Sequence, residues 1–369
     1  MALRIGVIGL RFGSIVHIPA YQAEGLDVVA VCSTREETAK AAAEKFGVPN
    51  WFTNHREMLA MEGLDAVAVV TPRPLHYSVA KDSLAAGKHI ICEKPFTTEL
   101  DQARELWETA EKAGVTAMVA HEFRFATARA RVKELIDEGY IGNLHMCMVQ
   151  LANPGYFPRI GRDLASDDQA ERGGGLLWGQ GSHYVDCLRH WFGEVQTVSG
   201  QVFTHLPDRK HPETGAIVAA TADDAYSFTL GFANGGWASM VASYVSPHGQ
   251  GTTIEIYGSD GSLSTPQPDA SSPNPPPHGK LYGAKLGEPA QAELAIPERL
   301  NPYSDDLLVQ DTHDGFMPMR MLAREFVNGV ESGTSPSPSF YDAYRCQQVL
   351  HAVRESSTTG RIVEIAAAT

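Results

Sequence analysis

The sequence predicts an α/β domain with a doubly wound parallel sheet, followed by an α+β domain built on a mostly antiparallel sheet. Three observations support this prediction. Short β-rich runs alternate with helical stretches through the first third of the chain, as in βαβ units. A glycine-rich turn joins the first run to the first helical stretch. After about residue 121, strand-like runs follow one another without intervening helices, which is typical of antiparallel pairing.

The first domain is expected to alternate strands with helices. The expected strands are residues 3–8, 28–31, 66–70, 89–92 and 115–120. The expected helices between them are residues 15–23, 36–46, 76–86 and 100–113. Because crossovers between parallel strands are right-handed, the carboxyl ends of all these strands should meet at one edge of the sheet. Open α/β sheets bind their ligands at that edge.

The second domain is expected to begin with a helix at residues 129–138, which Gly139 ends. The other expected helices are residues 176–192, 319–330 and 341–356. The expected strands are residues 145–151, 195–204, 226–232, 237–244, 253–257 and 362–365. A Pro- and Ser-rich stretch at 264–278 predicts an exposed loop. We therefore divide the chain into domains 1–121 and 122–369, and leave open whether the C-terminal segment packs back on the first domain.

The composition is that of an ordinary globular protein, with 43% hydrophobic and 20% charged residues among 369. The formal net charge of -14 argues against nucleic acid and anionic membrane surfaces, because both need basic patches. No stretch reaches the roughly 18 apolar residues of a membrane span. The N-terminus does not resemble a signal peptide, and the five cysteines form no Cys-x-x-Cys pair. We expect reduced thiols, a cytoplasmic location and no metal site.

A lysine follows the expected strand 89–92, within the run His-Ile-Ile-Cys-Glu-Lys-Pro at 89–95. An apolar run of this kind, bounded upstream by Gly87, suits a parallel strand covered on both faces. Lys94 then lies where open α/β sheets bind ligands. Pro95 restricts the backbone of Lys94 to extended geometry and is compatible with a cis peptide bond. We therefore expect the protein to use the charge of Lys94 at a ligand site.

The glycine turn has the context of a dinucleotide site, because it follows a strand and precedes a helix. Peptide N–H groups at the start of that helix would receive a pyrophosphate. Counting Gly-x-Gly-x-x-Gly from Gly9 places Arg11 in the second glycine position and Ser14 in the third. Arg11 must turn outward or contact phosphate oxygens, while Gly13 restores some flexibility. The alternative is a tight turn that binds no ligand.

The end of the second expected strand bears on which dinucleotide binds. An acidic residue there would bind the ribose hydroxyls of NAD. The residues present are Ser33, Thr34 and Arg35, whose hydroxyls and guanidinium suit a 2′-phosphate better. We therefore expect NADP(H) to be preferred, with NAD(H) as the alternative. A structural alternative is that Ser33 and Thr34 cap the helix that begins near Glu36.

Several stretches of the chain together resemble the Gfo/Idh/MocA family of NAD(P)-dependent sugar and cyclitol oxidoreductases. The run Ala-Ala-Gly-Lys-His-Ile-Ile-Cys-Glu-Lys-Pro at 85–95 matches the most diagnostic block of that family. The glycine turn continues into Val-His-Ile-Pro at 16–19, and Thr71-Pro72 precedes His76. Three glycines at 173–175 lead to Gly-Ser-His-Tyr-Val-Asp at 181–186. The resemblance covers nearly the whole chain.

The resemblance implies a Rossmann domain followed by a domain with an open antiparallel sheet, and a nicotinamide near Lys94. In this family the sheet commonly packs against another subunit, which implies a homodimer or homotetramer. His76 either lines the cofactor groove or caps a helix. The cofactor-binding residues expected from the turn and the resemblance are Gly9, Arg11, Phe12, Gly13, Ser33, Thr34, Arg35, Thr71, Pro72, His76, Glu93 and Lys94.

Oxidation of a secondary alcohol needs a hydride acceptor, a base for the hydroxyl proton and a group that stabilises the alkoxide. The resemblance assigns the stabilising charge to Lys94 and the base to His183, whose unperturbed pKa lies near neutrality. Asp186 shares a helix face with His183, so it would hold the imidazole or bind a substrate hydroxyl. The structural alternative for Lys94 is an ion pair with Glu93.

The sequence departs from the family at Gly179, where many members have an aspartate one helical turn before the histidine. Either His183 acts alone, or a neighbour takes a share of the acid–base work. The residues expected to reach the substrate are Tyr184, Trp178, Arg159 and Arg162, each with packing or surface exposure as its alternative, together with Gln180 and Asp186.

We therefore expect an oxidoreductase that acts on a small polar substrate, namely a sugar, a cyclitol or a related cyclic polyol. Gly179 keeps two alternatives open. The first is a redox-neutral enzyme that oxidises a sugar carbon transiently, with tightly bound NAD(P), so that a glycosidic bond is eliminated. The second is a cofactor-binding sensor without catalysis.

Overall fold

The computed structural model describes residues 2–266, 279–300 and 316–366, which form two compact units. The described residues up to 125, together with 316–347, belong to the first unit. Those from 126 to 300, together with 348–366, belong to the second unit. Helix α9 (Phe340–Thr359) begins in the first unit and ends in the second.

The sheet of the first unit has six parallel strands in the order β3-β2-β1-β4-β5-β6. The strands are β1 (Arg4–Ile8), β2 (Asp27–Cys32), β3 (Asn50–Phe52), β4 (Ala66–Val69), β5 (His89–Cys92) and β6 (Ala117–Val119). The order reverses between β1 and β4, which creates the ligand crevice of doubly wound folds. The predicted parallel sheet is confirmed. Strand β3 escaped prediction because its three residues, Asn-Trp-Phe, are at most half-buried and form no apolar run.

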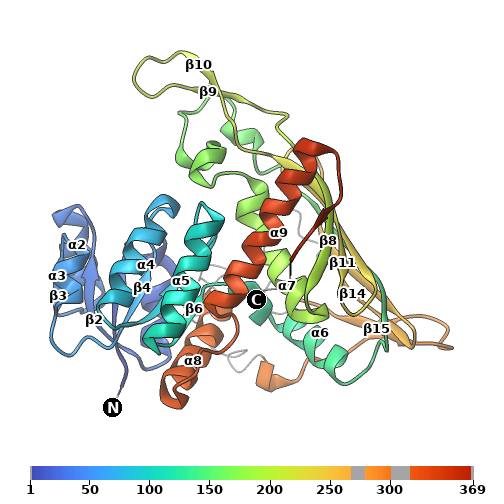
Figure 1. The fold of residues 1–369 in the computed structure, drawn as a ribbon, viewed down its shortest axis with the longest axis horizontal. Helices are drawn as coiled ribbons and strands as arrows, with labels where there is room; N and C mark the ends of the chain where they lie inside the picture. The colour runs from blue at the N-terminus through green and yellow to red at the C-terminus, as the bar shows by residue number, and fades with distance from the viewer. Residues whose placement is uncertain (1, 267–278, 301–315, 367–369) are drawn as a thin grey trace. The chain divides into compact units, whose positions relative to one another are not determined.

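Helices cover this sheet because its central strands are apolar on both faces. They are α1 (Ile18–Ala23), α2 (Glu36–Phe46), α3 (His55–Leu59), α4 (His76–Ala85), α5 (Leu100–Ala113) and α8 (Phe316–Ser332). Figure 1 shows α4 beside α5, and Lys81 of α4 donates a hydrogen bond to Glu105 of α5 at 2.6 Å. Helix α8 packs against α1, where Arg320 pairs with Glu24 at 2.6 Å.

The second unit is built on a nine-stranded sheet in the order β16-β15-β14-β13-β7-β12-β11-β8-β17. Neighbours are antiparallel except β7 and β12, which are parallel, so the predicted mostly antiparallel sheet is confirmed. Its strands are β7 (Leu144–Ala152), β8 (Val195–Phe203), β11 (Ala225–Phe232), β12 (Trp237–Ser243), β13 (Gly251–Gly258), β14 (Gly261–Pro266), β15 (Tyr282–Lys285), β16 (Ala292–Glu293) and β17 (Val363–Glu364). A separate hairpin pairs β9 (Asp208–Lys210) with β10 (Ile217–Ala219).

Helices α6 (Thr127–Asp137) and α7 (Ser182–Phe192) pack against each other in the second unit. Nearly every side chain of α7 is buried. The last turns of α9 cap the edge of β8, because Ser356 and Ser357 accept the backbone N–H groups of Gly200 and Val202, each at 3.0 Å. Buried residues alternate with partly or fully exposed ones along much of β8, β11 and β12, so one face of the sheet is covered and the other is open.

Two expected helices begin differently from the prediction. Residues 15–23 are a π-helical turn η1 (Gly13–His17) followed by α1, and residues 176–192 are a π-helical turn η7 (Leu177–Gly181) followed by α7. The prediction of a loop at 264–278 was wrong for residues 264–266, which belong to β14. Residues 267–278 lie outside the described part of the chain. Short 3-10 turns are Arg73–Leu75, Glu122–Phe125, Phe157–Arg159, Ser166–Asp168, Ala170–Arg172 and Glu298–Leu300.

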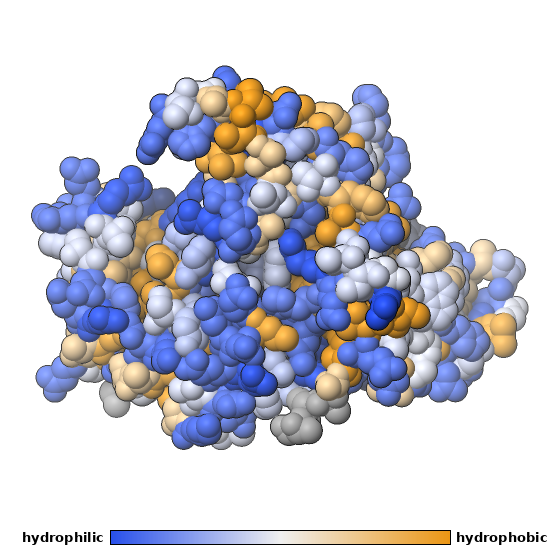
Figure 2. All heavy atoms as spheres, turned by 45° about the horizontal axis from the view of Figure 1, so that its top comes forward, coloured by the Kyte–Doolittle hydropathy of each residue, from blue (hydrophilic) through white to orange (hydrophobic). Residues whose placement is uncertain are grey.

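Hydrophilic side chains cover most of the face drawn in Figure 2, and hydrophobic ones are exposed there in smaller groups. Within the described part of the chain, no helix combines the length and the apolar character needed to span a bilayer. The same residues contain no group of three or more His, Cys, Asp or Glu side chains arranged to hold a metal ion.

Candidate active site

Lys94 lies at the carboxyl edge of the parallel sheet, directly after β5. The ladder continues on both sides of this point, because Glu93 N–H donates to Val69 O at 2.9 Å and Ala120 N–H donates to Cys92 O at 2.7 Å. The peptide bond from Lys94 to Pro95 is cis. The side chain of Lys94 is only partly buried. A rigid strand end thus presents this ammonium at the edge where the topology predicts a ligand.

A buried hydrogen-bonded chain holds Glu93, the residue before Lys94. His17 Nε2 lies 2.7 Å from Glu93 Oε1, and His17 Nδ1 lies 2.8 Å from the Tyr21 hydroxyl. Glu93 Oε2 accepts the backbone N–H of Lys94 at 3.0 Å. Burial opposes ionisation of Glu93, but the hydrogen bond from His17 and the nearby positive charges hold its pKa below the usual value. Both carboxylate oxygens of Glu93 therefore have partners within the protein.

The glycine turn after β1 has the features that a dinucleotide requires. Gly9 has a φ of 104°, and a Cβ there would lie 2.2 Å from Val70 O, so only glycine fits. A Cβ at Gly13 would lie 3.0 Å from Val7 Cγ1, the close approach that lets the helix start against the strand. Arg11 is exposed and has no ion-pair partner among the residues described. Its guanidinium is thus accessible to a phosphate.

Strand β2 ends beside β1, since Ile8 pairs with Cys32 and Gly9 N–H donates to Cys32 O at 2.9 Å. Arg11 and Arg35 each follow this shared edge by three residues. Arg35 is exposed and, like Arg11, lacks an acidic partner in the described part of the chain. Two guanidiniums without internal partners therefore project from adjacent strand ends.

The capping alternative for the end of β2 is not what the structure shows. Helix α2 has Arg35 at its N-cap and no side-chain capping bond. Ser33 Oγ instead accepts the backbone N–H of Arg35 at 3.3 Å, and Thr34 is exposed. These hydroxyls remain accessible on the strand-end loop.

His76 connects two strand-end loops rather than capping α4. Its Nε2 lies 2.8 Å from Thr71 O and its Nδ1 lies 2.9 Å from Pro95 O, and the ring is buried. Burial lowers the pKa of His76. The hydrogen bonds to the carbonyls of Pro95 and Thr71 favour the protonated ring and offset only part of this effect. The hydroxyl of Thr71 is buried without a hydrogen-bond partner among the described residues, and Pro72 is exposed. Thr71 is therefore a polar group of this edge that a ligand could satisfy.

In the second unit, His183 is the second residue of α7 and is buried, as is Asp186 one turn later. The π-helical turn η7 before it is anchored on Asp223. Asp223 Oδ2 accepts Leu177 N–H at 2.7 Å, and Asp223 Oδ1 accepts Arg354 Nη2 at 2.9 Å. A Cβ at Gly175 would lie 2.4 Å from Asp223 Oδ1, so the glycine lets the carboxylate approach. This anchor sets where α7 begins, and hence where His183 lies.

Other residues expected at the substrate differ in their surroundings. Trp178 is buried against His351, with ring centroids 5.1 Å apart, and the Tyr184 hydroxyl lies 3.3 Å from both Arg129 Nη2 and Thr252 Oγ1. Gln180 Oε1 is buried without a hydrogen-bond partner in the described structure.

Arg159 and Arg162 lie in the segment after β7 and converge on Asp168. Their guanidiniums lie 3.5 and 3.6 Å from its carboxylate, which Arg209 also contacts at 3.0 Å. Arg159 additionally stacks over Tyr156, 3.8 Å from the ring centroid. Both arginines thus form internal ion pairs with Asp168. Their expected role in substrate binding remains a prediction.

Comparison with known proteins identifies the family. Residues 3–121 match the oxidoreductase family with a NAD-binding Rossmann fold, and residues 130–264 match the GFO/IDH/MocA C-terminal domain. The chain belongs to the Gfo/Idh/MocA family. It is therefore an oxidoreductase with a NAD-binding Rossmann domain, as the sequence resemblance implied.

Relatives of this Gfo/Idh/MocA protein match along its full length. Levoglucosan dehydrogenase of Pseudarthrobacter phenanthrenivorans is 26% identical, covering 98% of each chain. D-xylose 1-dehydrogenase (NADP(+)) 2 of Haloferax volcanii is also 26% identical, again over 98% of each chain. The solved structure of levoglucosan dehydrogenase in complex with NADH and L-sorbose superimposes with a TM-score of 0.87, at 25% identity and 99% coverage of both chains.

Two elements of this Gfo/Idh/MocA site escaped sequence reasoning. His17 belongs to a stretch that carries the resemblance, yet its partner Glu93 is 76 residues away. Asp223 lies between expected strands and carries no motif, and Arg354 is 131 residues further on. The only sequence signal for the Asp223–Arg354 pair is the glycine run 173–175. It indicates that another group approaches the backbone closely there, but it does not identify Asp223 as that group.

Proposed function

We propose that this protein is an NADP-preferring dehydrogenase that acts on a secondary alcohol or ketone of a sugar, a cyclitol or a related cyclic polyol. The observation that carries the proposal is Lys94, fixed at the carboxyl edge of a NAD-binding Rossmann sheet by the ladder on both sides of β5. Relatives named for levoglucosan and D-xylose support a sugar-like substrate.

The residues have separate roles in this proposal. The ammonium of Lys94 stabilises the negative charge that develops on the substrate oxygen during oxidation. His183 removes the hydroxyl proton, and returns it in the reverse direction. Asp186 holds the imidazole or binds a substrate hydroxyl, with Gln180 as a further polar contact. When bound, the nicotinamide supplies the hydride acceptor. Gly9, Gly13 and the N–H groups of the first helical turn would hold its pyrophosphate.

Turnover assays against a panel of sugars, cyclitols and glycosides test this function. We expect reduced nicotinamide to accumulate with at least one free polyol. The redox-neutral alternative is favoured by Gly179, which replaces an acid–base residue of many relatives. It predicts release of an aglycone without net change in nicotinamide absorbance. Cofactor binding without turnover of any kind across the panel would instead indicate a sensor.

The preference for NADP rests on Arg11 and Arg35, which project from adjacent strand ends without acidic partners in the described structure. The acids nearby are Glu36, which pairs with Lys40 at 2.7 Å, and Glu37 on the following helix. Neither occupies the strand-end position that binds the ribose of NAD. A guanidinium there suits a 2′-phosphate.

Replacing Arg35 with Ala should raise the dissociation constant for NADPH about tenfold, because one charge-assisted contact with the 2′-phosphate is lost. The constant for NADH, measured by the same fluorescence titration, should stay within about twofold. Arg56→Ala is the matched control, since Arg56 lies on α3 and pairs with Asp82 of α4. Tighter binding of NADH than NADPH by the unaltered protein would contradict the preference.

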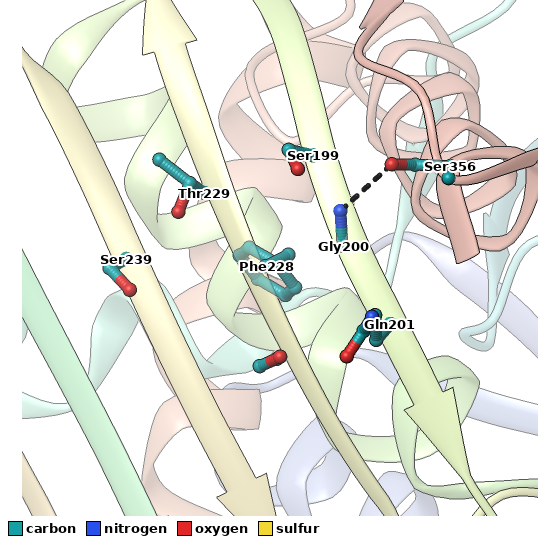
Figure 3. A pocket seen from close by; sticks show the side chains of 9 residues that line it. Ser199, Gly200, Gln201, Phe228, Thr229, Ser239 and Ser356 are labelled. Carbon is teal, nitrogen blue, oxygen red and sulfur yellow. Dashed lines mark hydrogen bonds between the residues drawn. The ribbon is translucent and has the colours of Figure 1, made fainter.

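We further propose that the exposed face of the nine-stranded sheet packs against a second copy of the chain. Large hydrophobic side chains lie open on this face, including Val241 at 54%, Trp237 at 41% and Met148 at 38% exposure. Beside them is a hollow of about 300 Å³ over β8, β11 and β12. Figure 3 shows its polar side chains, Ser199, Thr229 and Ser239, on three successive strands. Such exposure is unusual for a monomer and suits an interface.

Replacing Val241 with Glu should convert the oligomer into monomers near 40.0 kDa, because a charge is placed on the apolar face. Light scattering after size-exclusion chromatography measures the mass. Leu286→Glu is the control, since Leu286 is 83% exposed but lies in the turn after β15. A protein that is already monomeric, or a Val241→Glu variant of unchanged mass, would reject this interface.

A further inference from the structure

The chain Tyr21–His17–Glu93 is a buried polar group that the proposed chemistry does not use. His17 and Tyr21 are fully buried, and Glu93 is 7% exposed. Burying a carboxylate beside an imidazole costs desolvation energy, and such pairs are weak contributors to stability compared with apolar packing. Val16 and Ile18, on either side of His17, are buried as well. The pair therefore calls for a role other than stability.

The local backbone is built to bring His17 to Glu93. His17 ends the π-helical turn Gly13–His17, and the extra residue of a π turn shifts the side chains that follow it. Phe12 and Tyr21 contact the imidazole edge to face, with ring centroids 5.7 and 5.6 Å away. The ring is thus held in one orientation, aimed at the end of β5.

The hydrogen bonds are fully satisfied when His17 Nε2 carries the proton. Burial raises the pKa of the Tyr21 phenol well above its usual value, so its O–H remains a donor and lies 2.8 Å from Nδ1. Nε2–H then donates to Glu93 Oε1, and Glu93 Oε2 accepts Lys94 N–H. Tyr21 and His17 thus hold the Glu93 carboxylate, and that carboxylate accepts the backbone N–H of Lys94.

We propose that the chain Tyr21–His17–Glu93 is a positioning device for Lys94, which fixes its backbone and keeps its ammonium protonated when ligands exclude water. An opposite charge within about 4–6 Å favours the charged form of a lysine, whereas desolvation disfavours it. The other titratable groups near Glu93 are Cys92 and His76, and burial keeps the Cys92 thiol neutral. Lys94 is itself among the positive groups that lower the pKa of Glu93, so the charges of these two residues interact. This inference rests on the proposed function of Lys94.

The Glu93→Gln variant tests the inference, because glutamine keeps the size of the side chain but not the charge. Its oxygen still accepts the His17 bond, while its NH2 group cannot accept Lys94 N–H. We expect the pKa of Lys94 to fall by at least about one unit. NMR titration of protein labelled with 13C-lysine measures it, with Lys94→Arg to assign the resonance. In the enzyme, the alkaline limb of kcat/KM should move to lower pH by the same amount.

A second pair in the same unit is the matched control. His55 Nε2 lies 2.8 Å from Asp82 Oδ2, away from the strand end. Asp82→Asn should leave the titration of Lys94 unchanged. Glu93→Met is the second variant, should Glu93→Gln fail to fold, because it also removes the charge at similar size, and it should lower the pKa of Lys94 as well.

The outcomes separate this inference from the proposed function. An unchanged Lys94 titration in Glu93→Gln and Glu93→Met overturns the positioning role, even if both variants lose activity or melt earlier. A lowered Lys94 pKa supports it, even if no polyol is turned over. Absence of turnover by the unaltered protein counts only against the proposed function.

Discussion

Replacing Lys94 with Met should reduce kcat/KM by at least about 10³-fold, because the developing alkoxide then loses its positive partner. Replacing His183 with Asn should cost about 10²–10⁴-fold, the usual contribution of a general base. Both variants should bind NADPH with nearly unchanged affinity and melt near the temperature of the unaltered protein. Steady-state kinetics, fluorescence titration and calorimetry measure the three quantities.

Matched controls lie on the same elements. Lys88 is at the opposite end of β5, where its Nζ donates to Leu64 O at 2.8 Å, and Lys88→Met should retain turnover. His190 lies further along α7, and His190→Asn should do the same. Turnover that survives in Lys94→Met or His183→Asn would remove that residue from the proposed chemistry.

Replacing Asp223 with Ala should destabilise the second unit by roughly 3–5 kcal/mol, since the positive charge of Arg354 loses its buried partner. The N–H of Leu177 also loses its acceptor, so the turn η7 is no longer fixed where α7 begins. We expect kcat to fall by about 10²-fold even at temperatures where the variant is folded, because small displacements of a reacting group are costly. Chemical denaturation and kinetics below the melting temperature measure the two effects.

Two further variants separate the anchor from the charge. Asp223→Asn keeps an oxygen for Leu177 N–H but loses the negative charge opposite Arg354, so it should lower stability while retaining most of kcat. The double variant Asp223→Leu with Arg354→Met removes both charges and should recover stability but not kcat. If Asp223→Ala kept full activity when folded, η7 would not depend on this anchor.

Much of the fold followed from patterns a few residues long. The five expected strands of the first unit appear as β1, β2, β4, β5 and β6, within two residues at each end. Apolar runs, strand–helix alternation and the helix stop at Gly139 are signals that depend only on residues close together in the sequence. The two π-helical turns were not predicted, because one extra residue in a helical turn does not change the spacing of apolar residues enough to be recognised in the sequence.

The site divides in the same way. Placement of Lys94 at a sheet edge needs only the run 89–95 and the rule that parallel strands end together, so the sequence by itself determined it. It also determined the family, through motifs that each lie within about a dozen residues. Only the tertiary structure decided which buried group would partner Glu93, or that Asp223 would anchor the turn before His183. Those contacts join groups that are 76 and 46 residues apart in the sequence and less than 3 Å apart in space. Packing of the whole domain brings them together, and no local sequence pattern predicts it.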